Sequence, residues 1–132
     1  MVSNQLLVRV ETAEPHVITR AKQFINDNYA EDLSLEQVAK AVNVSTFYFC
    51  KLFHRVTGVK FTEYLSSVRI EKAKDLLLNR NLRISEIAYQ VGFQSLTHFN
   101  RVFKIILGRS PTTYRHLLPS VADKKPRVRA HE

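Results

Sequence analysis

The sequence contains an internal repeat in which one helical pattern occurs twice, about 50 positions apart. In the first part of each copy the offset is 49 positions, and Leu35, Val38, Ala39 and Val42 match Ile84, Ile87, Ala88 and Val91. In the second part the offset is 50 positions, and Ser45, Phe49, Phe53, Gly58 and Tyr64 match Ser95, Phe99, Phe103, Gly108 and Tyr114. The added residue falls between two helical segments, where an insertion interrupts neither helix. Two copies of one small structural unit are therefore expected.

Each copy predicts a short helix, a tight turn and a longer helix, which is the helix-turn-helix plan. Ser34 opens a capping-box pattern at the start of the first short helix. Ser45 and Ser95 are suited to cap the longer helices at their N-termini, and Gly58 and Gly108 are suited to end them.

The other segments complete an all-α architecture. Helical periodicity predicts a helix over about 15–29, a long helix over about 61–79 between the two copies, and a last short helix over about 110–117. The apolar residues of the long helix form two groups about a quarter-turn apart, Phe61, Tyr64, Leu65 and Val68 in one and Ile70, Ala73, Leu76 and Leu77 in the other. This helix is therefore expected to contribute to two small cores in succession.

The two ends of the chain differ from the repeat region. Residues 1–14 are interpreted as a linker or the stub of an upstream domain, because Leu6–Val10 resembles a severed strand or linker, and this favours a module cut from a longer protein. Residues 119–132 are basic and contain proline, with too little apolar surface to fold, so a flexible tail is expected. The folded region is expected over 15–118, with a first subdomain over about 15–60, the connecting helix over about 61–79 and a second subdomain over about 80–118.

Positive charge is concentrated in the repeat region. The chain carries 20 Lys and Arg against 12 Asp and Glu, a formal net charge of +8, and residues 33–120 hold 13 basic and 5 acidic residues, which accounts for the whole excess. No acidic residue occurs between Glu36 and Glu63 or between Glu86 and Asp123. A polyanion beside either window would be attracted without like-charge repulsion. A basic face that only keeps the protein soluble explains the charge count equally well.

The patterns of other common functional classes are absent. No run approaches the roughly 20 apolar residues of a membrane span, and a single cysteine, Cys50, cannot form an internal disulfide; both features favour a cytoplasmic protein without a membrane partner. The five histidines show no metal-ligand spacing with one another or with Cys50. Nucleotide-binding loops, nucleophile elbows and paired carboxylates are missing. We therefore expect neither an enzyme nor a cofactor or metal site.

The longer helix of each copy separates an inward from an outward face. The inward residues are expected to be Phe49, Leu52, Phe53 and Val56 in the first copy and Phe99, Val102, Phe103 and Ile106 in the second. The outward residues are Phe47, Cys50, Lys51 and His54, flanked by Tyr48 and Arg55, and in the second copy Thr97, Arg101 and Lys104, beside His98 and Asn100. For Phe47, a ring partly buried against the preceding turn is the alternative.

These outward side chains are suited to duplex DNA. Arg or Lys can donate to guanine O6 and N7, Asn can pair with adenine, and an apolar ring can touch a thymine methyl. Arg101 is predicted to contact bases, because no acidic residue lies near it in sequence. Lys104, Arg55 and Arg115 are predicted to contact phosphates, which position a protein without specifying sequence.

The second copy carries a pattern that resembles the signature of the AraC/XylS family of bacterial transcription regulators, namely Ile87-Ala88, Gly92-Phe93, Ser95, Phe99, Arg101, Phe103-Lys104, Gly108, Ser110-Pro111 and Tyr114-Arg115. The resemblance covers about residues 15–118 and implies seven helices, arranged as two helix-turn-helix subdomains joined by a long helix. The base-facing positions that it implies are Phe47, Tyr48, Cys50, Lys51, Thr97, His98, Asn100 and Arg101. The expected contacts with the DNA backbone are Ser45, His54, Arg55, Ser95, Lys104 and Arg115.

The sequence therefore predicts a sequence-specific DNA-binding transcription regulator. It is expected to bind double-stranded DNA as a monomer in this form, with its two longer helices in successive major grooves. The resemblance favours activation through contact with RNA polymerase, and dimerisation through a further N-terminal domain. Two alternatives stay open: a basic protein-interaction module that docks an acidic partner, and an architectural DNA binder that does not discriminate among sequences.

Overall fold

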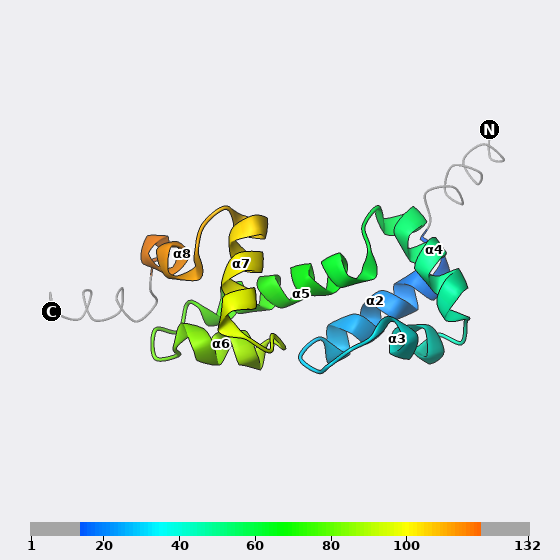
Figure 1. Cartoon of the computed structure of the whole chain (residues 1–132), viewed down its shortest axis with the longest axis horizontal. Helices are drawn as coiled ribbons and strands as arrows, with labels where there is room; N and C mark the ends of the chain where they lie inside the picture. Colours follow the sequence, from blue (N-terminus) through cyan, green and yellow to red (C-terminus); the bar gives the residue numbers. More distant parts are fainter. Residues whose placement is uncertain (1–13, 120–132) are drawn as a thin grey trace, which may run out of the picture. The chain divides into compact units, whose positions relative to one another are not determined.

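Seven helices and no strand make up residues 14–119, the part of the chain that the computed structural model describes (Figure 1). They are α2 (His16–Asn28), α3 (Leu35–Ala41), α4 (Thr46–Thr57), α5 (Phe61–Leu76), α6 (Ile84–Gln90), α7 (Leu96–Leu107) and α8 (Pro111–Leu117). The predicted all-α class is confirmed. The linker or stub expected over residues 1–14 and the tail expected over 119–132 lie, apart from Glu14 and Pro119, outside the described residues. No helix within this range combines the length and apolarity needed to cross a bilayer.

The helix bounds reproduce the internal repeat. Both ends of α3 and α6 are offset by 49 positions, and both ends of α4 and α7 by 50 positions, the same two offsets as in the apolar pattern. The turn within each copy contains one residue with a left-handed backbone, Asn43 with φ of 61° and Gly92 with φ of 107°. Gly and Asn are the residues that adopt this region most readily. The additional residue of the second copy lies in its turn, as predicted.

Side-chain caps fix where the helices of the first copy begin. The Gln37 backbone N–H donates to Ser34 Oγ at 3.2 Å, and the Ser34 N–H donates to Gln37 Oε1 at 2.7 Å, which completes the predicted capping box. Ser45 Oγ accepts from the Tyr48 N–H at 3.1 Å at the start of α4. Gly58 then ends α4 in the left-handed conformation.

The second copy keeps this scheme with one change. Ser95 Oγ accepts from the His98 N–H at 3.1 Å, and Gly108 ends α7 as Gly58 ends α4. Arg83 stands at the position that matches Ser34, and its side chain makes no cap bond. Only the reciprocal half of the box remains there, in which the Arg83 N–H donates to Glu86 Oε1 at 2.7 Å.

The chain divides into two compact units. One holds residues up to Asp27 together with Leu33–Phe61, and the other holds Asn28–Asp32 together with residues from Thr62 onward. The expected division assigned Asn28–Asp32 to the first subdomain, and the structure instead packs this segment with the second unit. The connecting helix ends at Leu76 rather than near Asn79, because Asn79 accepts turn hydrogen bonds from the N–H groups of Asn81 and Leu82.

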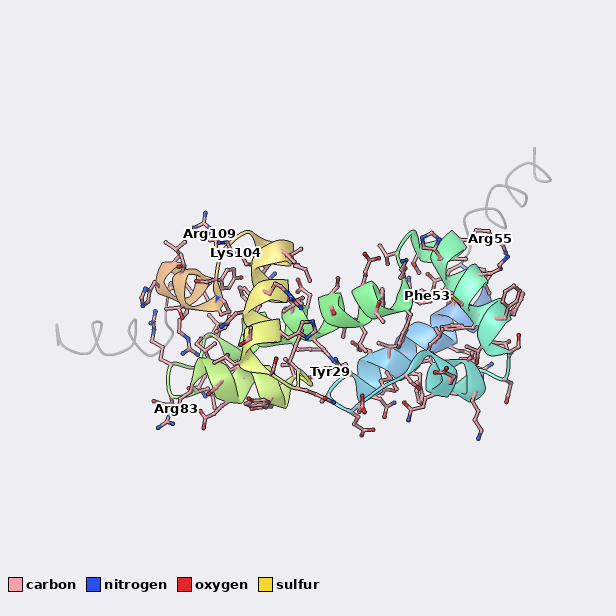
Figure 2. All side chains as sticks on the ribbon, viewed as in Figure 1. Tyr29, Phe53, Arg55, Arg83, Lys104 and Arg109 are labelled. Carbon is pink, nitrogen blue, oxygen red and sulfur yellow. The ribbon has the colours of Figure 1, made fainter. Side chains whose placement is uncertain are left out.

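Aromatic rings from α4 lie at the centre of the first unit. The Phe49 and Phe53 side chains are 0% and 1% exposed, and their ring centroids are 5.4 Å apart. Phe61, the first residue of α5, packs edge-on against Phe53 at 6.4 Å (Phe53 is labelled in Figure 2). From α2 and α3 the same unit buries Ile18, Ala21, Ile25, Val38 and Ala39.

The second unit repeats this plan with a longer aromatic chain. Ring centroids are 5.3 Å apart for Phe93 and Phe99, 5.6 Å for Phe99 and Phe103, and 5.4 Å for Phe103 and Tyr114. The core also contains Ile70, Ala73, Leu77, Ile87, Ala88 and Val91. The prediction that the long helix contributes to two cores is confirmed, since its first residue packs in one unit and its second half packs in the other.

One inward placement on α7 is wrong. Ile106 is 40% exposed, and Ile105 beside it is 74% exposed. Leu107 packs against the core instead. The helix ends at this residue, so its last turn covers the core with Leu107 and leaves both isoleucines outside.

The turn of the second unit approaches the segment Asn28–Asp32 closely. Arg69 on α5 donates from Nε to the Tyr29 carbonyl and from Nη2 to the Glu31 carbonyl, both at 2.8 Å. A Cβ atom at Gly92 would lie 2.7 Å from that Tyr29 oxygen and 2.8 Å from Arg69 Nε. Partial burial lowers the pKa of Arg69, and the nearby Asp32 charge offsets part of this effect.

Truncation of the central ring tests the second core. Phe103→Ala is expected to reduce the free energy of unfolding by about 3–5 kcal/mol, because it leaves a cavity among closely packed rings. Ile105→Ala removes a mostly exposed side chain from the same helix and should change it by less than about 0.5 kcal/mol. Urea unfolding of both variants measures the difference. Equal losses would contradict the assignment of the inward face.

Alanine at two left-handed glycines separates backbone strain from steric contact. Gly58→Ala should cost about 1–2 kcal/mol, because φ is 82° but no atom lies within 4 Å of the new Cβ. Gly92→Ala should cost about 1–3 kcal/mol more, because its Cβ also meets the Tyr29 carbonyl. Thermal and urea unfolding compare the two variants, and similar losses would mean that the close approach is not maintained in solution.

Candidate nucleic-acid interface

The outer face of α4 exposes every side chain that the sequence placed there. Phe47 is 71% exposed and Tyr48 is 51% exposed, so the alternative in which the Phe47 ring is buried against the preceding turn is wrong. The other exposed members of the predicted set are Cys50, Lys51, His54 and Arg55. Arg55 extends away from the ribbon of α4 (Figure 2). This face therefore combines exposed rings with hydrogen-bond donors.

The outer face of α7 carries different side chains from the outer face of α4, although the two helices have the same length. Its exposed side chains are Thr97, His98, Asn100, Arg101 and Lys104. The His98 ring also packs edge-on against the Phe93 ring, with centroids 5.5 Å apart, and this contact restricts its orientation. Except for this contact, the face consists of polar and cationic groups that project into solvent.

Neither helix carries an acidic residue that could neutralise its cations. The salt bridges Lys22–Glu14 and Lys74–Glu71 involve other elements, at 2.6 Å and 3.0 Å. An uncompensated cation near a surface attracts phosphates over a range of about 10 Å at 0.1 M salt. The two outer faces are thus electrostatically suited to a polyanion.

The N-cap serines combine capping with a free donor. Ser45 Oγ and Ser95 Oγ each accept a backbone hydrogen bond at 3.1 Å, and both residues are exposed. A hydroxyl that accepts one bond still has its own hydrogen to donate. Each serine is therefore able to cap its helix and donate to an external acceptor such as a phosphate oxygen.

Arg115 has a structural role that the sequence did not reveal. Its Nε donates to the Leu77 carbonyl and its Nη2 to the Asn79 carbonyl, each at 3.1 Å. Arg80 in turn donates to the Leu118 carbonyl at 3.2 Å and the Arg115 carbonyl at 3.4 Å. Each arginine thus satisfies carbonyls beside the C-terminal end of a helix, where no intrahelical donor is available.

These hydrogen bonds give Arg115 a structural role in addition to the phosphate contact predicted for it, and that contact stays a prediction. Partial burial, followed by the nearby Arg80 charge, lowers the pKa of Arg115. Two of the guanidinium nitrogens are oriented toward protein carbonyls, and the residue is half-buried. Arg69, Arg80 and Arg115 all act through contacts distant in sequence, and no local pattern signals them.

Residues 14–119 contain no group of three or more His, Cys, Asp or Glu side chains arranged to hold a metal ion.

A family profile described as a helix-turn-helix domain matches residues 38–116. The lactose operon transcription activator of Staphylococcus xylosus is 36% identical over 99 residues, which cover 75% of this chain and 36% of that protein. The C-terminal domain of AraT, a response regulator from Geobacillus stearothermophilus, matches with a TM-score of 0.75 and 37% identity, over 80% of this chain and 88% of that chain. The DNA-binding domain of AdpA, solved with a target DNA, matches with a TM-score of 0.70 and 25% identity, over 75% and 89%.

The chain spans about a third of the length of the curated relatives it matches, at 37%, 35% and 32% for three of them. The AraT and AdpA domains are matched over most of their length. The similarity therefore concerns one domain, which the other proteins combine with further sequence.

Replacement of Arg115 tests its structural role. Arg115→Met should lower the free energy of unfolding by about 1–2 kcal/mol, because the Leu77 and Asn79 carbonyls beyond the end of α5 lose their donor. His116→Gln changes an exposed residue of the same turn and should leave stability within about 0.5 kcal/mol. Thermal unfolding compares the two. A stable Arg115→Met protein with a weaker salt dependence of DNA binding would show that Arg115 acts through a phosphate contact and not through the fold.

Proposed function

We propose that this chain, which belongs to the AraC/XylS family of helix-turn-helix transcription regulators, binds duplex DNA at a specific sequence. The observation that carries the proposal is the pair of matched helices α4 and α7. Each buries an apolar face in its own unit and exposes an acid-free face of donors and rings. An α-helix with its side chains is about 10–12 Å wide, which fits the roughly 12 Å major groove.

The exposed faces supply two kinds of contact. Base edges are contacted by Phe47, Tyr48, Cys50 and Lys51 from α4 and by Thr97, His98, Asn100 and Arg101 from α7. Phosphates are contacted by Ser45, His54, Arg55, Ser95, Lys104 and Arg115. Base contacts select a sequence, and phosphate contacts set the register of the domain on the duplex and supply salt-dependent affinity.

Two reading helices imply a site with two parts. Each helix enters its own stretch of major groove, and the two stretches follow one another along one asymmetric site. The base-facing sets of the two helices differ at every matched position, so the two parts of the site have different sequences. A monomer therefore suffices for binding, and any dimerisation requires surfaces outside the two reading helices.

The regulatory output that we propose is activation of transcription, through contact with RNA polymerase in the bacterial cytoplasm. It is supported by the relative from Staphylococcus xylosus, whose name describes a transcription activator. We also propose dimerisation through a further N-terminal domain, because the relatives are about three times as long as the matched region.

Selection of bound duplexes from a randomised DNA pool, at near-physiological salt, tests the binding function. Two enriched boxes about one helical turn apart are expected. A single box would mean that one motif holds only the backbone. Retention without enrichment would indicate an architectural binder, and failure to retain DNA would redirect the search to an acidic protein partner.

Two substitutions on α7 separate base contacts from phosphate contacts. Arg101→Ala should cost about 1–3 kcal/mol on the selected site and relax the preference at one base pair. Lys104→Ala should weaken binding to all duplexes alike and reduce the slope of log K against log salt by about one unit. Binding titrations at several salt concentrations measure both. The opposite pattern would exchange the two roles.

A further inference from the structure

We propose that Phe47 acts as a positioning residue, whose ring holds the Lys51 ammonium at the start of α4 for contact with a guanine. The inference rests on the proposed function and refines it. For Phe47 it replaces the direct base contact of the proposed function with an indirect one, in which the base preference at this point belongs to Lys51.

The geometry that carries this proposal is a cation–π contact on an exposed helix face. Lys51 Nζ lies 4.9 Å from the centroid of the Phe47 ring. An ammonium within about 6 Å of a ring centroid is attracted to the negative face of the ring. The two residues are four positions apart on α4, a spacing at which side chains on a helix are neighbours.

The exposure of Phe47 needs an explanation that packing does not supply. The ring is 71% exposed, although burial of an aromatic side chain is strongly favourable and α4 buries two other phenylalanines. Within residues 14–119, the Phe47 ring makes its cation–π contact with Lys51. A ring that serves to hold a neighbouring cation has to lie on the outer face of the helix with that cation.

The two matched positions in the second copy carry an arginine and no ring. Lys51 corresponds to Arg101, and Phe47 corresponds to Thr97. Arginine presents a planar, rigid fork of donors, whereas lysine has a compact charge on a flexible four-carbon chain. The ring thus occurs in the copy whose cation has the less defined geometry.

The contact also sets where the ammonium lies. Helical side chains lean toward the N-terminus, so Lys51 reaches back to the first turn of α4, where Phe47 is located. In helix-turn-helix proteins, residues near the N-terminus of the second helix contact the base edges. An ammonium already held there loses less conformational freedom on binding guanine O6 and N7.

Nuclear magnetic resonance of the free 132-residue chain tests the contact without DNA. The Lys51 side-chain protons nearest the ammonium should be shifted upfield by the ring, and Phe47→Leu should return them to ordinary positions. Tyr89→Leu, which removes another exposed ring outside the proposed interface, should leave them shifted. Ordinary shifts in the wild-type chain would overturn the proposal.

A double-mutant cycle on a selected duplex tests the positioning role. Phe47→Leu and Lys51→Met should weaken discrimination at the same base pair, and the double variant should bind about as well as Lys51→Met alone. The expected coupling is about two- to fivefold in Kd, the range of an exposed cation–π contact. Phe47→Trp should restore the discrimination, because it supplies another ring.

Two results of the cycle would overturn the inference while the proposed function stands. Additive effects would show that the ring and the ammonium act independently. Loss of preference at a different base pair in Phe47→Leu would show that the ring contacts a base directly. If selection yields no enriched duplex, the proposed function fails instead, and the proton shifts still decide whether the ring holds Lys51.

Discussion

The burial of paired phenylalanines decides the rest of this structure. Phe49 and Phe53 on α4, and Phe99 and Phe103 on α7, lie four positions apart and are at most 1% exposed. Together each pair fixes the rotation of its helix about its own axis. Residues on the side of the helix opposite the phenylalanine pair then face solvent, whatever their chemistry. The two copies thus share their helix lengths and a buried phenylalanine pair, and the side chains on the outer faces are free to differ.

The exposed side chains of α4 and α7 differ in chemistry. The outer face of α4 carries two aromatic rings and a lysine, whereas that of α7 carries short polar side chains and an arginine. Rings provide apolar area and hold cations, and amide, hydroxyl and guanidinium groups provide directed hydrogen bonds. The two units share one pattern of helices and therefore offer different chemistry to a partner only through their exposed side chains.

Local features could be predicted from the sequence, because their determinants lie within a few residues. The caps at Ser34, Ser45 and Ser95 and the inward phenylalanines follow from spacing alone. Long-range contacts could not. The hydrogen bonds of Arg115 reach carbonyls 36 and 38 positions away, and Ile106 is exposed because Leu107 occupies the place that spacing assigned to it. The outward residues were placed correctly, but their contacts with bases and phosphates remain predictions.

The close approach at Gly92 limits how far the two copies are interchangeable. Asn43 provides the left-handed residue in the first turn with φ of 61°, whereas Gly92 in the second has φ of 107°, outside the region that Asn adopts readily. In the second turn, any side chain would also displace the carbonyl and guanidinium that lie against the glycine. A chimera that carries the first turn twice would therefore change the local backbone and lose the docking of Asn28–Asp32. The two motifs share one pattern of helices, but the missing side chain at Gly92 prevents the first turn from replacing the second.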